Sequence, residues 1–265
     1  MNRYKFIDEN KEHLHTLDGK PLIGTTTALN VLAKTLTWWA SGLAVKELGW
    51  TNPKETDSAT RLQVANAKLE EIKQMGTPEY ILLLDRGYKA HSVKLDKSAD
   101  AGTDMHAELE QYVKECIDRG GKPLGYDLGE KTNPYVLAFS DWAMKNVKGF
   151  LASEAHGYSE RLWVGGVFDL LYEDLEGRLV IMDFKSAKQV YMSHFFQCAG
   201  NDLEISESGV LDKDGNELMK LDRSVAYYGV FPFGAKNPEP QFHFDVEGAR
   251  KGFEACVTLH KIINQ

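Results

Sequence analysis

The sequence predicts an α/β protein, in which a mixed β-sheet is flanked by helices and preceded by a helical extension. Apolar runs of strand length recur in the second half of the chain, and amphipathic segments of helix length fill most of the first half. Between the last two long strands, residues 188–203 have the pattern of a helix. A helix in that place is typical of a crossover between parallel strands, so the sheet should contain parallel and antiparallel pairs.

Individual elements follow from turn and capping signals. A turn at Asp18-Gly19 predicts a hairpin within residues 4–24, and the hydroxyls of Thr25-Thr26-Thr27 are suited to cap the helix that follows. Further helices are predicted at 58–75, from Thr77-Pro78 until the chain becomes basic at 86–102, at 102–119, and from Asn133-Pro134 to about Lys148. Strands are predicted at 150–156, 162–173, 178–185, 224–232 and 240–245, with a polar hairpin at 205–222 and a terminal helix at 246–263.

Composition narrows the class of protein. The chain has 265 residues, of which 43% are hydrophobic and 26% charged, as in ordinary soluble domains. No apolar run approaches the ~20 residues that span a bilayer, and the N-terminus carries charges where a signal peptide needs an apolar segment. Three distant cysteines without a Cys-x-x-Cys pair argue against disulfides and an iron–sulfur cluster. We therefore expect a cytoplasmic protein with no membrane partner.

The net charge of the chain is weak evidence against a nucleic-acid partner and does not exclude one. The net charge is −8, whereas contacts to phosphate need lysine and arginine. The distribution of charge matters more than its sum, and residues 86–102 are locally basic. Lys89, Lys94 and Lys97 in this stretch could hold a phosphate backbone, and a solvated loop is the simpler interpretation.

The strands at 162–173 and 178–185 carry the most informative pattern. If Leu175-Glu176-Gly177 forms a three-residue hairpin loop with Gly177 in the left-handed conformation, Asp174 faces Arg178. Counting back along this antiparallel pair places Asp169 opposite Asp183. Charged groups at the end of an apolar hairpin are unfavourable unless they hold a metal ion or each other.

Asp183 and Lys185 lie on one face of their strand, because side chains alternate with a period of two. Two carboxylates can hold Mg²⁺ or Mn²⁺, and the ion acidifies a bound water and stabilises charge on a phosphoryl oxygen. Lys185 could orient that water or balance the developing charge. The pattern therefore suits hydrolysis of a phosphodiester. It equally fits an ordinary ion pair at the rim of the sheet, since acid-x-Lys is a common tripeptide.

Other side chains could complete such a site. His106 and Glu110 are four residues apart on the helix at 102–119 and share a face. Glu154, on the first long strand, points either toward Asp169 or into solvent. Gln197 on the crossover helix could face the same site, as could His194.

Four motifs, taken in order, resemble those of the PD-(D/E)XK nuclease superfamily, in its RecB-type branch. The elements are Gly102-Thr103-Asp104-Met105-His106, which is similar to the G-T-x-x-H helix; Gly166-Val167-Phe168-Asp169, similar to G-x-x-D; Asp183-Phe184-Lys185, similar to acid-x-Lys; and Gln197, similar to the glutamine of Q-x-x-x-Y. The N-terminal helix with its threonines and tryptophans is also similar to recombination nucleases and the mitochondrial genome maintenance exonuclease. The resemblance implies a restriction-endonuclease-like core.

The resemblance also implies roles for individual residues. His106, Asp169, Asp183 and the backbone carbonyl of Phe184 would surround one or two Mg²⁺ or Mn²⁺ ions, with Lys185 as the catalytic lysine. Gln197 would support the site or the DNA, and Glu154 matches a less constant glutamate of the family. Asn201 stands where the family has tyrosine and inherits no role. The cysteines of the iron–sulfur members are missing.

From this resemblance we expect a metal-dependent deoxyribonuclease, an exonuclease of recombination, repair or phage DNA processing. Its partner would be DNA that is single-stranded or has free ends, together with a recombination or single-strand-binding protein, in the host cytoplasm if a phage encodes it. A helical extension at 1–100 would form the substrate channel and pack with a nuclease core at 101–265. Two alternatives stay open: a non-catalytic DNA-binding or assembly module on the same fold, and a hydrolase of a small phosphate ester.

Overall fold

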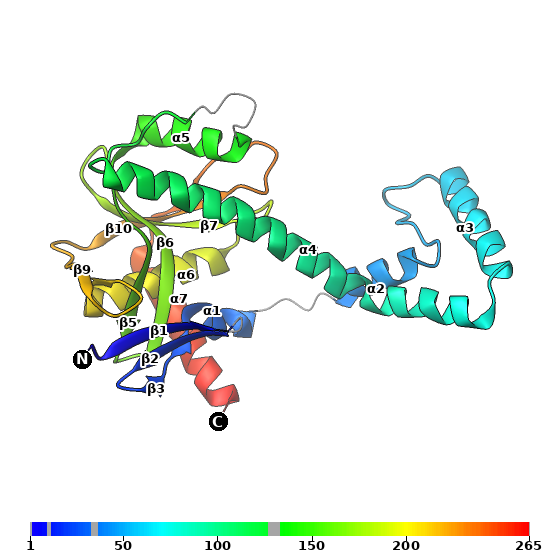
Figure 1. The fold of residues 1–265 in the computed structure, drawn as a ribbon, viewed down its shortest axis with the longest axis horizontal. Coiled ribbons are helices and arrows are strands. Elements are labelled where there is room, and N and C mark those ends of the chain that lie inside the picture. Colours follow the sequence, from blue (N-terminus) through cyan, green and yellow to red (C-terminus); the bar gives the residue numbers. More distant parts are fainter. Residues whose placement is uncertain (1, 10–11, 33–36, 127–132, 265) are drawn as a thin grey trace. The chain divides into compact units, whose positions relative to one another are not determined.

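The computed structural model describes residues 2–9, 12–32, 37–126 and 133–264, and it divides the chain into two compact units. One unit contains Met1–Ala33 and Asp104–Gln265, and the other contains Lys34–Thr103 (Figure 1). A boundary near residue 100 was expected, but the first 33 residues belong with the core instead of with the extension. The reason is strand pairing, because β4 (Ile23–Gly24) lies parallel to β6 in the main sheet.

The main sheet has eight strands and is mixed, as predicted. Its order is β11-β10-β7-β6-β5-β8-β9, with β4 paired to β6. Neighbours β5, β6 and β7 are antiparallel, whereas β7 and β10 are parallel and joined through helix α6, the predicted crossover. The strands are β5 (Val147–Ser159), β6 (Val164–Asp174), β7 (Leu179–Lys185), β8 (Val210–Leu211), β9 (Glu217–Met219), β10 (Val225–Pro232) and β11 (Gln241–His243).

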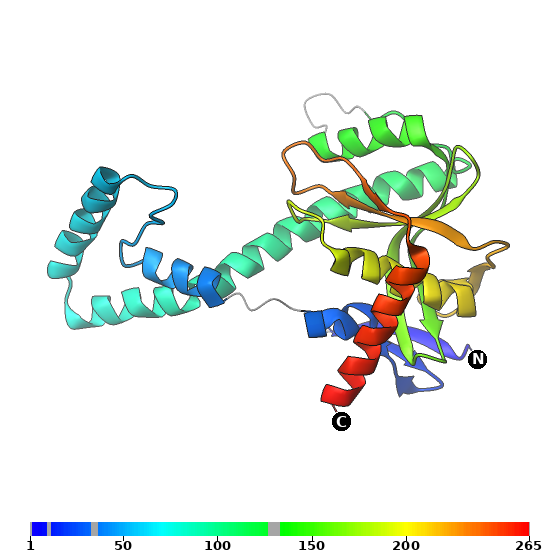
Figure 2. The same cartoon turned by 180° about the vertical axis from the view of Figure 1, so that it is seen from behind.

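Helices cover both faces of this sheet (Figure 1 and Figure 2). Side chains of α6 (Met192–Ser208) and α7 (Val246–Ile263) pack on one face, around Phe168, Ile181 and Phe253. On the other face, α5 (Pro134–Asn146) and the last turns of α4 pack around Phe139 and Met182. The α/β class with a central mixed sheet flanked by helices is thereby confirmed. In the described part of the chain, no helix is both long and apolar enough to cross a membrane.

The predicted β6–β7 hairpin is confirmed in its turn and its register. Gly177 has a φ of 77°, and the backbone N–H of Asp174 donates to the carbonyl of Arg178 at 3.0 Å. Pairing runs from Glu173↔Leu179 to Leu170↔Met182 and then stops. Asp169 and Asp183 are the next residues on each strand, so both carboxylates lie where the two strands separate.

A small antiparallel sheet precedes the core. It consists of β1 (Tyr4–Glu9), β2 (Glu12–Leu17) and β3 (Lys20–Pro21), with the predicted turn at Asp18-Gly19, both of which have positive φ. The hydroxyl of Tyr4 lies 2.7 Å from Nδ1 of His15 and 3.1 Å from Nδ1 of His156 on β5. These buried contacts attach the small sheet to the main one.

The second unit is helical, but not with the predicted divisions. It holds α2 (Thr37–Lys46), α3 (Ser58–Lys73) and the first part of α4 (Thr77–Asp118). Two helices separated by the basic stretch 86–102 were predicted, and this is wrong, because α4 is one helix of 42 residues. Gly87 does not break it: a Cβ at Gly87 would lie 3.1 Å from the carbonyl oxygen of Ala44, so the glycine permits close packing against α2.

Thr25 does not cap a helix as predicted. The N-cap of the short helix α1 (Thr25–Ala28) is Gly24, and α1 passes into the 3₁₀ helix η1 (Leu29–Leu32). The Thr25 hydroxyl instead donates to Oε1 of Glu204 on α6, a carboxyl that is 1% exposed. This contact between residues 179 positions apart fastens the N-terminal segment to the core.

Glu204 makes a measurable contribution to the pH dependence of stability. Burial raises its pKa to about 8, outweighing the Thr25 hydrogen bond, which lowers it. Because the folded pKa lies above the unfolded value of 4.5, the stabilisation is complete below pH 4.5 and is lost as the pH rises through about 8. Glu204→Gln resembles the protonated form, so between pH 5 and pH 8 wild type should lose about 1 kcal/mol or more of unfolding free energy relative to Glu204→Gln. Urea unfolding of both proteins in EDTA measures this difference, and parallel pH profiles would contradict it.

Candidate metal centre

Three side chains from three elements meet where β6 and β7 separate. His106 comes from α4, Glu154 from β5 and Asp169 from β6, and one potential ligand atom of each lies within 4.8 Å of the others. Nε2 of His106 is 3.0 Å from Oδ2 of Asp169, and Nδ1 of His106 is 3.4 Å from Oε1 of Glu154. Among the described residues, this is the one group of histidine, cysteine and acidic side chains close enough to share a metal ion.

Strand geometry explains how the two carboxylates meet. In the β5–β6 ladder, Ser153 pairs with Leu170 and Ala155 with Phe168, so Glu154 lies opposite Asp169. Glu154 has a φ of 47°, the left-handed region, which costs a residue other than glycine about 1–3 kcal/mol. Such strain within a strand persists only where the surroundings enforce it, and here it accompanies the approach of a glutamate to an aspartate.

Asp183 and Lys185 form the second part of the centre. Nζ of Lys185 donates to Oδ1 of Asp183 at 2.7 Å, and the Asp183 residue is 1% exposed. The backbone N–H of Phe184 donates to Oδ2 of Asp169 at 2.5 Å, which joins the two parts. Met182 and Phe184 pack in the opposite layer, as the period of two predicts.

The charges of this centre perturb one another. Burial lowers the pKa of His106, but its contacts with Asp169 and Glu154 prevail and raise it to about 9. Burial and the charge of Asp169 raise the pKa of Glu154 to about 7. Burial also raises the pKa of Asp183 to about 7, although Lys185 opposes the shift. For Asp169, burial raises the pKa, while His106 and Lys185 lower it and prevail. The negative charge of the three carboxylates, when all are ionised, therefore exceeds the positive charge that His106 and Lys185 supply.

A divalent cation fits this arrangement. Oε1 of Glu154 and Oδ2 of Asp183 are both buried without a hydrogen-bond partner, and an oxygen in that state is unfavourable unless a cation or proton binds it. Carboxylate oxygens with one imidazole form a donor set that Mg²⁺ or Mn²⁺ can use. Glu154, Asp169 and His106 would hold the ion, with Asp183 beside it.

Sequence reasoning named each of these residues, but weighted one of them too little. Glu154 was held less firmly than Asp183, whereas the structure groups it with His106 and Asp169. The register of the β5–β6 pair, counted as for β6–β7, is the signal that could have placed it. The carbonyl of Phe184 stays a prediction, although its N–H contacts Asp169.

Several predicted residues are not brought into the group. Glu110 forms an ion pair with Lys114 on the exposed side of α4 and is not among the clustered ligands. Gln197 is half-buried on α6, and no hydrogen bond joins it to the cluster among the described residues. His194 does lie near Lys185: burial, and then the lysine charge, lower its pKa to about 4.

The basic residues of the predicted loop lie on α4 in the second unit. Lys89 and Lys94 are exposed there, and the side chain of Lys97 is outside the described part of the chain. Their proposed contact with a phosphate backbone stays a prediction.

Asn201 belongs to a buried cluster that sequence analysis missed. Its Oδ1 has no hydrogen-bond partner, and a Cβ at Gly166 would lie 3.0 Å from that atom and 2.6 Å from Oε2 of Glu204. The two oxygens face the same small space, so a proton on Glu204 would have an acceptor in Asn201. A Cβ at position 166 would clash with this polar group, so glycine is the residue that leaves room for it.

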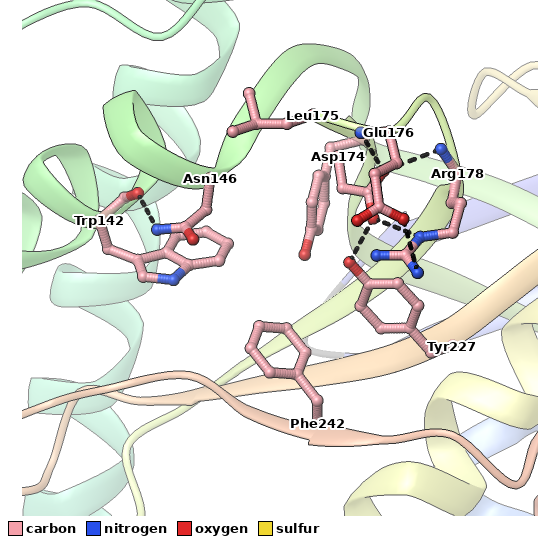
Figure 3. A pocket seen from close by; sticks show the side chains of 9 residues that line it. Trp142, Asn146, Asp174, Leu175, Glu176, Arg178, Tyr227 and Phe242 are labelled. Atoms are coloured by element: carbon pink, nitrogen blue, oxygen red, sulfur yellow. Dashed lines mark hydrogen bonds and ion pairs between the residues drawn. The ribbon is translucent and has the colours of Figure 1, made fainter.

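A separate cavity of about 190 Å³ lies at the turn of the β6–β7 hairpin (Figure 3). Aromatic rings of Trp142, Tyr227 and Phe242 line it. Two acidic residues line it: Asp174 accepts from Arg178 and from the hydroxyl of Tyr227, and Glu176 forms an ion pair with Arg178. Five residues separate Asp174 from Asp169 along β6, which is about 16 Å. Because the Asp174 oxygens have partners, this cavity is not the metal centre.

Comparison with known protein families finds no family that matches the chain, and no curated protein matches it either. The function is therefore argued from the residues of the site.

Proposed function

We propose that this protein is a divalent-metal-dependent DNA nuclease of the RecB-type PD-(D/E)XK class. The observation that carries the proposal is the meeting of His106, Glu154 and Asp169 beside the Asp183–Lys185 pair at the open end of the β6–β7 hairpin. Acids that converge with a lysine at a strand separation suit phosphodiester hydrolysis better than a structural role, because Oδ2 of Asp183 and Oε1 of Glu154 are buried without a hydrogen-bond donor, the latter facing His106 at 3.4 Å.

Each residue has a part in this chemistry. His106, Glu154 and Asp169 would hold the cation, and Asp183 fixes Lys185 beside them through a 2.7 Å hydrogen bond. The bound cation supplies an acidified water and positive charge next to a phosphoryl oxygen. Lys185 is held protonated, since the charges of Asp183 and Asp169 raise its pKa despite burial. It orients the attacking water or stabilises the charge of the transition state.

The type of nuclease, its substrate and its partner protein are proposed from the motif resemblance. We propose an exonuclease of recombination, repair or phage DNA processing that acts on DNA with free or single-stranded ends. A recombination or single-strand-binding protein would be its partner. The histidine, the acids and the lysine of three of the four motifs lie at one site, which supports this assignment, whereas Gln197 of the fourth motif has no hydrogen bond to it among the described residues.

Metal dependence tests the proposal directly. End-labelled linear and circular DNA, single- and double-stranded, should be degraded with Mg²⁺ or Mn²⁺ and left intact with EDTA. Asp183→Ala should abolish degradation, because it removes the buried carboxylate that fixes Lys185. Asp222→Ala, at an exposed aspartate paired only with its neighbour Arg223, serves as the matched control and should keep wild-type activity.

The outcomes separate the candidate functions. Loss of linear but not circular DNA establishes an exonuclease. Binding of DNA in EDTA without cleavage of any form would favour the non-catalytic module, and cleavage of a mononucleotide ester alone would favour the small-ester hydrolase.

A further inference from the structure

A second cavity lies beside the metal centre, between the N-terminal hairpin and β6. Its volume is about 410 Å³. Phe6 and His13 come from the hairpin, Thr26 and Thr27 from α1, and Val167 from β6. We call it the Phe6 cavity.

The strands fix its position relative to the centre. Val167 precedes Asp169 by two residues, so both side chains lie on one face of β6, about 7 Å apart. His156 pairs with Val167, and the Phe6 ring lies 4.9 Å from the ring of His156. The pair formed by His156 and Val167 therefore lies between Phe6 and the pair formed by Glu154 and Asp169.

A short stretch of the adjoining edge of β6 has no strand partner, although Gly166, Phe168 and Asp169 are buried there. On this edge β4 pairs with β6 as far as Gly165, and β7 pairs with it only from Leu170 onward. Within the described residues, no strand covers Gly166–Asp169 on that side. Val167 of the cavity and Asp169 of the metal centre both belong to this unpaired stretch.

The residues that line the Phe6 cavity determine which class of ligand it can bind. Among the described residues that line the cavity there is no lysine or arginine, and its buried His15 is neutral at pH 7, because burial and then His156 lower its pKa to about 4. The rings of Phe6 and His13 are nearly parallel, with centroids 6.0 Å apart, and the residues Thr26 and Thr27 are exposed. A phosphate would need positive charge here. A flat, neutral group with polar edges matches rings and hydroxyls.

We infer that the Phe6 cavity binds the unpaired base of the nucleotide next to the phosphodiester bond that is cut. This inference rests on the proposed nuclease function and names its substrate, a strand that is single-stranded at the site of cleavage. A base inside a duplex is stacked and paired, and it reaches a protein cavity only after it leaves the stack. Stacking on aromatic rings then holds any of the four bases without sequence preference.

The test is equilibrium binding of single-stranded DNA to the full chain in EDTA, with an abasic unit placed in turn at each position near the two ends. One abasic position should raise the Kd by about 5-fold or more, the loss expected for one stacked base. Phe6→Ala should raise the Kd for intact DNA similarly and show no further loss with that abasic strand. 2-Aminopurine at the same position should change its fluorescence on binding to wild type but not to Phe6→Ala.

Two further variants test whether the loss of binding comes from the cavity itself. Thr26→Trp replaces an exposed residue and fills the cavity, so it should weaken binding as Phe6→Ala does without lowering the melting temperature. Phe244→Ala removes an exposed ring outside the cavity and should bind like wild type. The inference is overturned if abasic and intact strands bind wild type equally at every position, if Thr26→Trp binds as wild type does, or if intact DNA does not bind. Cleavage with Mg²⁺ or Mn²⁺ in the same preparation tests the proposed function separately.

Discussion

Replacing Lys185 with alanine is expected to reduce DNA hydrolysis by about 100-fold or more, which is the effect of removing a group that positions water or stabilises charge in the transition state. Lys185 is held by Asp183 next to the cluster of His106, Glu154 and Asp169. Single-turnover cleavage of labelled linear DNA measures the rate.

Lys188→Ala is the matched control, because Lys188 is exposed and lies three residues further along the same segment. It should keep the wild-type rate. The melting temperature and the Kd for DNA show whether Lys185→Ala is folded and binds substrate. A folded Lys185→Ala protein that hydrolyses DNA as fast as wild type would refute the catalytic role of the lysine.

Glu154→Gln is expected to separate stability from activity. Without metal, the Glu154 carboxylate has a buried oxygen without a hydrogen-bond partner and faces the like charge of Asp169. A neutral amide removes that repulsion, so the melting temperature of Glu154→Gln in EDTA should exceed that of wild type. Hydrolysis should fall by about 10-fold or more, because one ligand of the cation is lost.

The metal response completes this experiment. Mn²⁺ should raise the melting temperature of wild type by more than that of Glu154→Gln, since only native protein with a complete ligand set binds the ion tightly. Glu110→Gln is the control: Glu110 is the other candidate glutamate, is paired with Lys114, and lies outside the cluster. Equal responses of wild type and Glu154→Gln would exclude Glu154 as a ligand.

Local signals account for what the sequence predicted well. The β6–β7 hairpin was predicted because Gly177 tolerates a positive φ, and the register that brings Asp169 level with Asp183 then follows by counting. The terminal helix, α7, has the bounds predicted from its pattern. Residues near in sequence decide such features.

Long-range packing decided what the sequence did not reveal. The basic residues at 86–102 suggested a break between two helices, yet Gly87 allows α2 and α4 to approach and the helix continues. The left-handed backbone of Glu154 has no local signal, because glutamate has no preference for it. The bond between Thr25 and Glu204 joins segments far apart in the chain.

The metal centre draws on four elements, α4, β5, β6 and β7, whose contributing residues extend from His106 to Lys185. A ribosome must therefore have released most of the chain before any of these groups can meet, and closing so long a loop is unfavourable until the sheet has formed. A nascent or truncated chain that lacks one of these elements cannot assemble the site that would bind the cation. Cation affinity at the proposed site would consequently report completion of the fold, because the residues of that site meet only in the folded chain.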